Sequence, residues 1–136
     1  MPLIPSPQPA AGTLDSGPGP SSAVALASVA RTATTQVFFT PGDHDALEVL
    51  INLTAFAVAA SLTPSIEAYD PASDTWETLL TGVAIVANGA QSIRVGGFYT
   101  AAANVAAQRA LAPQMRITLT HGNANSHTYS VGLRAQ

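Results

Sequence analysis

The most informative part of this sequence is SLTPSIEAYDPASDTWETLL, residues 61–80. Apolar and polar side chains alternate over residues 66–69, the period of two that is typical of a half-buried strand. DPASD, residues 70–74, supplies turn chemistry, because proline presets φ and the Asp and Ser side chains bond to nearby backbone. The β-prone alternation then resumes with the one tryptophan of the chain, Trp76. This stretch predicts a β-hairpin.

A lone hairpin is marginally stable in water, so its apolar face needs further strands to cover it. The rest of the chain contains such segments, separated by turn signals and without a repeated βα unit. These candidate strands are residues 23–29, 32–39, 47–54, 91–95, 115–119 and 128–133, with residues 55–60 as an extension of the third. We therefore predict an all-β fold, an antiparallel β-sandwich or jelly-roll-like barrel of seven to eight strands.

One segment favours helix instead. Residues 100–112, TAAANVAAQRALA, are rich in alanine, with Thr100 as a possible cap and Pro113 as a stop. The same residues are also compatible with a long excursion that contains a single helical turn. We expect at most one short helix in this chain.

The N-terminal part has a different composition from the rest. Residues 1–22 contain six of the ten prolines of the chain, which disfavours helix and central strand and predicts an extended, polyproline-like arm. Fully extended, such an arm spans roughly 65 Å at about 3.1 Å per residue. We divide the chain into this arm and a β-sandwich domain, residues 23–136. A plain disordered tail is the alternative for the arm.

Several apolar side chains are candidates for an interface between subunits. The arm carries aliphatic residues, which solvating tails rarely do. Within the predicted strand 32–39, one aromatic residue faces away from Val37 and Phe39. The interface residues that we assign are Leu3, Ile4 and Leu14 as arm anchors, together with Phe38 and Tyr99.

The composition also suggests that the protein assembles with other subunits. Only 10% of the residues are charged, whereas soluble domains average about 25%. Surfaces that face other subunits are poor in charge, so the composition suggests permanent assembly; biased genome composition is the alternative explanation. The net charge is −3 and the five basic residues are scattered arginines. We therefore expect neither a nucleic-acid partner nor a membrane partner.

We find no pattern that predicts catalysis or a cofactor. The chain has no cysteine and no nucleophile-elbow motif. Asp43, His44 and Asp45 are adjacent, so on an extended chain they point to opposite faces, and we expect a solvated turn rather than a metal site. His121 and His127 lie in a polar connection with Asn123 and Asn125, which predicts hydrogen bonding within that connection, or less readily a sugar or subunit contact.

Two pairs of acidic residues resemble an acid and base couple. Asp70 and Asp74 flank the predicted turn, and Glu67 and Glu77 are expected to lie near each other across the hairpin. Acid catalysis needs burial or a like-charge partner to shift a carboxyl pKa, whereas carboxylates on exposed turns keep ordinary values. We expect all four to be exposed, and we predict that the protein is not an enzyme.

Three stretches resemble small structural proteins encoded among the head genes of tailed bacteriophages. They are TPSIEAYDPASDTWETLL (63–80), TAAANVAAQRALAP (100–113) with the preceding IRVGGFY, and MRITLTHGNANSHTYSVG (115–132). The resemblance covers most of residues 61–133 and implies a virion component, such as a capsid decoration or minor head protein. It brings no catalytic residues. The long Pro-rich arm and the scarcity of aromatic residues after Trp76 depart from the family pattern.

The first reading is therefore a decoration (cement) protein on the capsid exterior, assembled in the host cytoplasm, with the major capsid protein and copies of itself as partners. A carbohydrate- or cell-surface-binding module is an alternative, and it predicts that Tyr69, Trp76, Phe98 and Tyr99 cluster on one face. A tail-tube or head–tail joining subunit is a further alternative.

Overall fold

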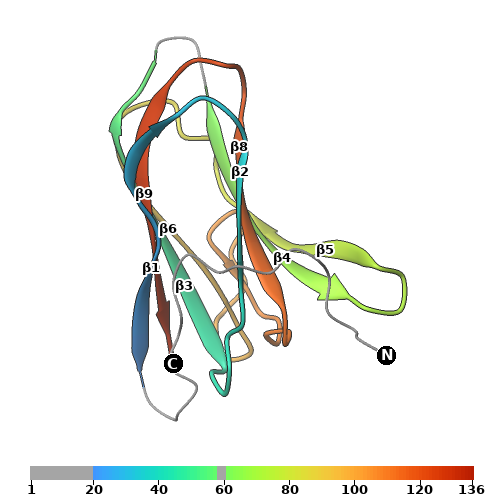
Figure 1. Cartoon of the computed structure of the whole chain (residues 1–136). Helices are drawn as coiled ribbons and strands as arrows, with labels where there is room; N and C mark the ends of the chain where they lie inside the picture. Colours follow the sequence, from blue (N-terminus) through green and yellow to red (C-terminus); the bar gives the residue numbers. More distant parts are fainter. Residues whose placement is uncertain (1–19, 58–60) are drawn as a thin grey trace.

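The computed structural model describes residues 20–57 and 61–136. All helices and strands assigned within these residues are strands; no helix is present among them (Figure 1). The strands of this part are β1 (Ser21–Arg31), β2 (Thr35–Phe39), β3 (Ala46–Ala55), β4 (Leu62–Asp70), β5 (Thr75–Thr81), β6 (Gly89–Gly96), β7 (Ala106–Ala107), β8 (Met115–His121) and β9 (His127–Ala135).

The strands form two sheets that pack face to face. Sheet A has the order β1-β9-β3-β6-β7, and sheet B has the order β2-β8-β4-β5. Every pairing is antiparallel except the parallel pairing of β6 with β7. The predicted antiparallel β-sandwich is thus confirmed. The described residues contain one strand more than expected, because the two-residue β7 had no signal in the sequence.

The hairpin predicted from residues 61–80 is formed by β4 and β5. Tyr69 lies opposite Trp76 in its register, and Asp70 lies opposite Thr75. Figure 1 shows this hairpin projecting away from the body of the sandwich. Its outer end therefore has less of the molecule packed around it than the strands of the core have.

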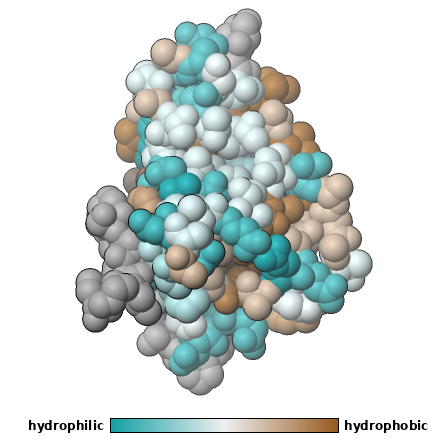
Figure 2. Space-filling model, turned by 90° about the vertical axis from the view of Figure 1, so that its right-hand side faces the viewer, coloured by the Kyte–Doolittle hydropathy of each residue, from teal (hydrophilic) through white to brown (hydrophobic). Residues whose placement is uncertain are grey.

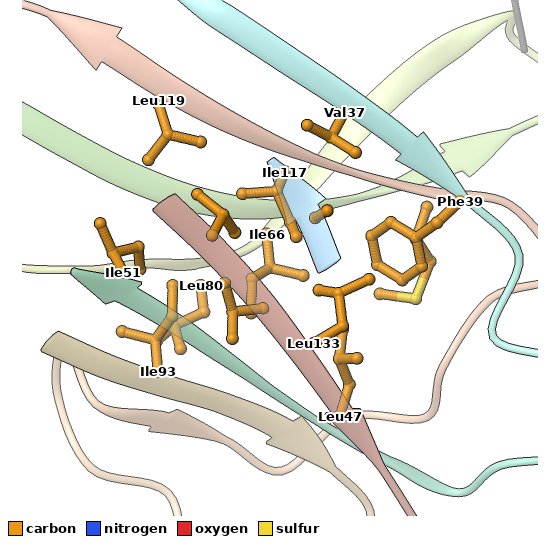
Figure 3. Packing of buried hydrophobic residues seen from close by; sticks show 14 of the residues in the cluster. Val37, Phe39, Leu47, Ile51, Ile66, Leu80, Ile93, Ile117, Leu119 and Leu133 are labelled. Carbon is orange, nitrogen blue, oxygen red and sulfur yellow. The ribbon is translucent and has the colours of Figure 1, made fainter. Parts of the chain in front are cut away.

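The core lies between the two sheets, where apolar side chains from both inner faces meet (Figure 3). On β3 the alternating residues Leu47, Val49, Ile51 and Leu53 are all buried, as their spacing predicts. Sheet B contributes the opposing layer. Its buried residues include Val37, Phe39, Ile66, Leu80, Met115, Ile117 and Leu119.

The helix considered for residues 100–112 does not form. β7 lies within this segment and pairs with β6, where the Arg94 N–H donates to the Val105 carbonyl at 2.9 Å. Asn104 adopts a left-handed φ of 62°, which a helix does not allow. Alanine favours helix only weakly, so hydrogen bonds to the exposed edge of β6 outweigh that preference here.

Residues 23–39, considered as one long interrupted strand, become two strands in different sheets. β1 belongs to sheet A and β2 to sheet B, and residues 32–34 carry the chain across. β1 begins at Ser21, two residues before the predicted boundary of the sandwich. The arm residues 1–19 lie outside the described residues, and so do residues 58–60 of the extension predicted for β3.

Candidate functional site

The predicted interface residues do not come together. Leu3, Ile4 and Leu14 lie outside the described residues. Phe38 lies on the outer face of sheet B, because its neighbours Val37 and Phe39 point into the core. Tyr99 follows β6 and packs against Arg94 on the outer side of sheet A, with its ring centroid 5.6 Å from the guanidinium carbon. Each of the two marks a separate surface.

The first surface lies on sheet B and is formed by Phe38, Glu67, Tyr69, Trp76 and Arg116; we call it the aromatic surface. The ring centroid of Trp76 is 5.2 Å from that of Tyr69 and 5.5 Å from that of Phe38. The guanidinium carbon of Arg116 lies 4.6 Å from the centre of the Trp76 ring. All five side chains are partly buried, so each keeps some contact with solvent.

An ion pair lies within the aromatic surface. Arg116 donates from Nε to Glu67, whose carboxylate also accepts from the hydroxyls of Ser65 at 3.2 Å and Thr118 at 3.3 Å. The Arg116 and Glu67 side chains are 19% and 12% exposed. We expected Glu67 to be exposed, and that prediction is wrong, because Arg116, Ser65 and Thr118 surround its carboxylate. Glu77 is exposed as predicted and pairs instead with Arg109 at 3.1 Å.

The turn at the end of the hairpin fixes the position of Tyr69. Its hydroxyl donates to Asp74 Oδ1 at 2.7 Å, and this bond raises the pKa of Tyr69. Asp70 accepts from the Ser73 hydroxyl at 2.7 Å and from the Ala72 N–H at 3.0 Å, which lowers the pKa of Asp70. Both Asp residues are exposed as predicted, and these hydrogen bonds keep Asp70 ionised, contrary to what an acid catalyst needs.

The second surface is a groove of about 530 Å³ whose lining includes Glu48, Tyr99 and Arg134; we call it the charged groove. Arg134 Nη2 donates to Glu48 at 2.5 Å, and Ser92 Oγ donates to the same carboxylate at 2.5 Å. The bond from Ser92, together with Arg134, holds the pKa of Glu48 below its usual value despite the opposing effect of burial. Register places Glu48 between Arg94 and Arg134, so the three form a row across sheet A.

A third cluster joins the two sheets at the opposite end of the molecule. His127 is fully buried and stacks on Phe56, with 4.9 Å between ring centroids. His121 Nε2 lies 3.0 Å from the Tyr129 hydroxyl. Burial, His127 and the nearby Arg31 lower the pKa of His121, which favours its neutral form. The predicted polar connection therefore does not include His127, whose ring is fully buried against Phe56.

The structure of residues 43–45 differs in one respect from the solvated turn that the sequence predicts. Asp43 and Asp45 are exposed, but His44 is buried, so the expectation of a fully solvated turn is wrong for His44. Within residues 20–57 and 61–136, no cluster of three or more metal-binding side chains is found.

The four aromatic residues of the predicted carbohydrate platform divide between two places. Tyr69 and Trp76 belong to the aromatic surface, whereas Phe98 pairs with Tyr99, at 5.0 Å between ring centroids, on the side of sheet A. Phe38 and Arg116 complete the aromatic surface, and sequence analysis did not connect them with Trp76. Their outward position was readable from alternation, but their proximity to Trp76 depends on strand order.

Comparisons with known proteins leave the family of the chain open. No protein-family model matches it, and no curated protein does. One similar solved structure is that of infectious bursal disease virus, Gx strain, with 8% sequence identity and a TM-score of 0.35. The match covers 93% of this chain and 29% of that chain. A likeness at this level identifies neither a family nor a function, so the resemblance to tailed-phage head proteins stays a prediction.

The described residues contain no helix that is long and apolar enough to cross a membrane.

Proposed function

We propose that this chain is a non-enzymatic virion structural protein, a decoration protein that binds the outside of a capsid shell. Its partners are the major capsid protein and further copies of itself. The arm, residues 1–22, fastens neighbouring subunits, with Leu3, Ile4 and Leu14 as its anchors. The protein needs no cofactor for this role.

The observation that carries the proposal is the β1 edge of sheet A, which pairs with no further strand among residues 20–57 and 61–136. β1 is an edge strand, and its residues 21–30 contain no charged residue and no proline. Its last residue, Arg31, donates to the Ala27 and Val29 carbonyls, and the pairing with β9 shifts on both sides of Leu26. Edge strands that remain in solvent usually carry charges or proline, since a plain edge pairs with other strands. Val24 and Val29 are 62% and 52% exposed along this edge. Such an edge is suited to a permanently assembled protein.

The energetics of such an assembly are favourable even for small contacts. At about 25 cal/mol per Å², a few hundred Å² of apolar surface contributes several kcal/mol before ordering costs are subtracted. Symmetric repetition over a shell then multiplies weak contacts. Other exposed apolar side chains, Val83 and Phe98, can contribute to the same contacts.

The described residues form no large hydrophobic patch on the face on the side of the β4–β5 hairpin (Figure 2). Figure 2 shows the side toward which the β4–β5 hairpin projects, where hydrophilic and intermediate residues dominate and strongly hydrophobic residues form small separate patches. This favours several limited contacts over one large hydrophobic interface.

The alternatives have less support. A carbohydrate-binding module was expected to gather Tyr69, Trp76, Phe98 and Tyr99 on one face, and their division between two surfaces favours the structural role. No feature of the described residues specifically supports a tail-tube or head–tail joining subunit.

The experiment is co-sedimentation with shells assembled from the major capsid protein of the same genome. We expect the full-length protein to pellet with the shells to saturation. Val24→Lys and Val29→Lys, which place charge on the β1 edge, should weaken binding, whereas the matched variant Val86→Lys, away from that edge, should not. Sedimentation velocity of the protein alone measures self-association with the same variants.

A wild-type protein that stays in the supernatant at all concentrations contradicts the capsid proposal. Equal binding by all three lysine variants leaves the shell partner in place but removes β1 from the contact. Turnover of a small molecule by the purified protein would contradict the assignment as a non-enzyme.

A further inference from the structure

The aromatic surface has the composition of a polyproline-binding site. Domains that recognise Pro-rich segments present grooves lined by aromatic side chains, because proline rings pack against aromatic faces and the polyproline helix loses little entropy on binding. Phe38, Tyr69 and Trp76 come from three strands of sheet B, and the ring centroids of Phe38 and Tyr69 each lie within 5.5 Å of that of Trp76.

Two of the three rings of this surface, those of Tyr69 and Trp76, are already held in place. Tyr69 is anchored through its hydroxyl by Asp74, and Trp76 is bracketed by Arg116 and Tyr69. Glu67 in turn holds Arg116. A ligand that binds here therefore does not have to order these side chains, which lowers the cost of binding.

The chain itself contains a segment with matching chemistry. Residues 2–9, PLIPSPQP, hold four prolines in eight residues and favour the polyproline conformation. No charged residue occurs between residues 2 and 14, so desolvating this segment against aromatic rings buries no charge. Leu3 and Ile4 add apolar area between the prolines.

This segment is tethered close to the surface. The described chain starts at Pro20, just before β1, and the register places Ser21 beside Ala135, which also pairs with Leu47 near the start of β3. The short connection from Phe39 to β3 places the end of β2, and hence Phe38, at this same end of the sandwich (Figure 1).

The tether is long enough for the segment to reach its own sheet B. Residues 10–19 span about 16–19 Å as a flexible chain and about 30 Å when extended. The tether has to pass from sheet A, where β1 lies, to sheet B, and packed sheets are about 10 Å apart. A short flexible tether gives an effective concentration in the millimolar range, far above that of a second copy in dilute solution.

We propose that residues 2–9 fold back within the same chain and lie on the aromatic surface as a polyproline helix. The arm is then stored on its own sandwich before assembly. This inference does not depend on a capsid partner, since residues 2–9 can bind the aromatic surface in a protein that does not bind shells.

Trp76 is the one tryptophan of the chain, so its fluorescence reports directly on this surface. The test compares the full-length wild type with a full-length variant that carries Pro5→Ala, Pro7→Ala and Pro9→Ala. We expect the variant to show red-shifted Trp76 emission and stronger quenching by acrylamide. Pro18→Ala, in the tether, is the matched control and should behave as the wild type.

A second step adds the binding partner in trans. A synthetic peptide of residues 1–12 should reverse the red shift of the triple variant, and Phe38→Ala introduced into that variant should weaken this reversal. Identical emission and quenching of the wild type and the triple variant would overturn the proposal.

Two further outcomes would assign the surface to another occupant. If quenching of the wild type falls as its concentration rises from about 1 µM to about 100 µM, the arm binds a second copy and not its own chain. If maltoheptaose changes the emission of the triple variant and the peptide does not, the surface is a carbohydrate site. Either result contradicts the proposal.

Discussion

The two outer faces of the sandwich carry the same pair of residue types in different surroundings. On sheet B, Glu67 and Arg116 are 12% and 19% exposed. On sheet A, Glu48 and Arg134 are 22% and 58% exposed. In both cases the partners are opposite each other in the register of neighbouring strands.

The difference lies in what covers each pair. The indole of Trp76 lies over Arg116, whereas Arg134 borders an open groove. Charges removed from water depend strongly on their partner, while exposed pairs contribute little because water and salt compete for them. The same two side chains should therefore matter for stability on sheet B and much less on sheet A.

The largest effect is expected when the covered pair is broken. Glu67→Ala leaves Arg116 partly buried without its carboxylate, which should lower the free energy of unfolding by about 2–3 kcal/mol. Urea unfolding followed by Trp76 fluorescence measures this loss. Glu67→Gln keeps a hydrogen-bond acceptor and should lose less. A loss for Glu67→Ala no greater than that for Glu48→Ala would contradict the role of the aromatic cover.

Removing the cover should have the next largest effect. Trp76→Leu takes away the ring contacts with Arg116, Tyr69 and Phe38, at an expected cost of about 1–2 kcal/mol. The remaining ion pair should also become more sensitive to salt, which thermal unfolding by circular dichroism at low and high ionic strength detects. Phe98→Ala is the control. Its ring is 60% exposed, and its loss should change stability by no more than about 0.5 kcal/mol.

Breaking the open pair should cost less. We expect Glu48→Ala to lower the free energy of unfolding by no more than about 1 kcal/mol. Added salt at about 0.5 M should reduce even this difference from the wild type, because screening weakens exposed pairs. A loss that is large and independent of salt would show that the charged groove is as well shielded as the aromatic surface.

The smallest expected effect is the loss of the Glu48 contribution to stability at acidic pH. The pKa of Glu48 in the folded protein lies below the ordinary value of 4.5, so the unfolded chain binds a proton on this residue more readily. Its contribution to stability is present above pH 4.5 and is lost as the pH falls through the folded pKa. The melting temperatures of the wild type and Glu48→Gln should therefore converge on acidification. If their difference stays constant from neutral to acidic pH, Glu48 does not contribute in this way.

Local patterns predicted the elements that depend on neighbouring residues in the chain. The β4–β5 hairpin combines alternating strands with Pro71 and two turn Asp residues, all within residues 61–80. The buried face of β3 was equally readable, because side chains on a strand alternate strictly between its two faces.

Features that depend on distant partners were not predictable. In residues 100–112, alanine content pointed toward helix, but the free edge of β6 supplied hydrogen bonds that a reading of local sequence does not contain. His127 looked like part of a polar connection, yet Phe56 stacks on it from a strand end about 70 residues away. Phe38 was correctly placed on an outer face, but its neighbour Trp76 was not identified.

By itself, the amino-acid sequence determined the all-β class, the hairpin, the inward faces of most strands and the scarcity of charge, since each follows from composition or from a period of two. The tertiary structure alone decided the order of strands in each sheet. That order brings Glu67 and Trp76 to Arg116 and sets Glu48 between two arginines, because side chains on separate strands meet only after long-range pairing has chosen their neighbours.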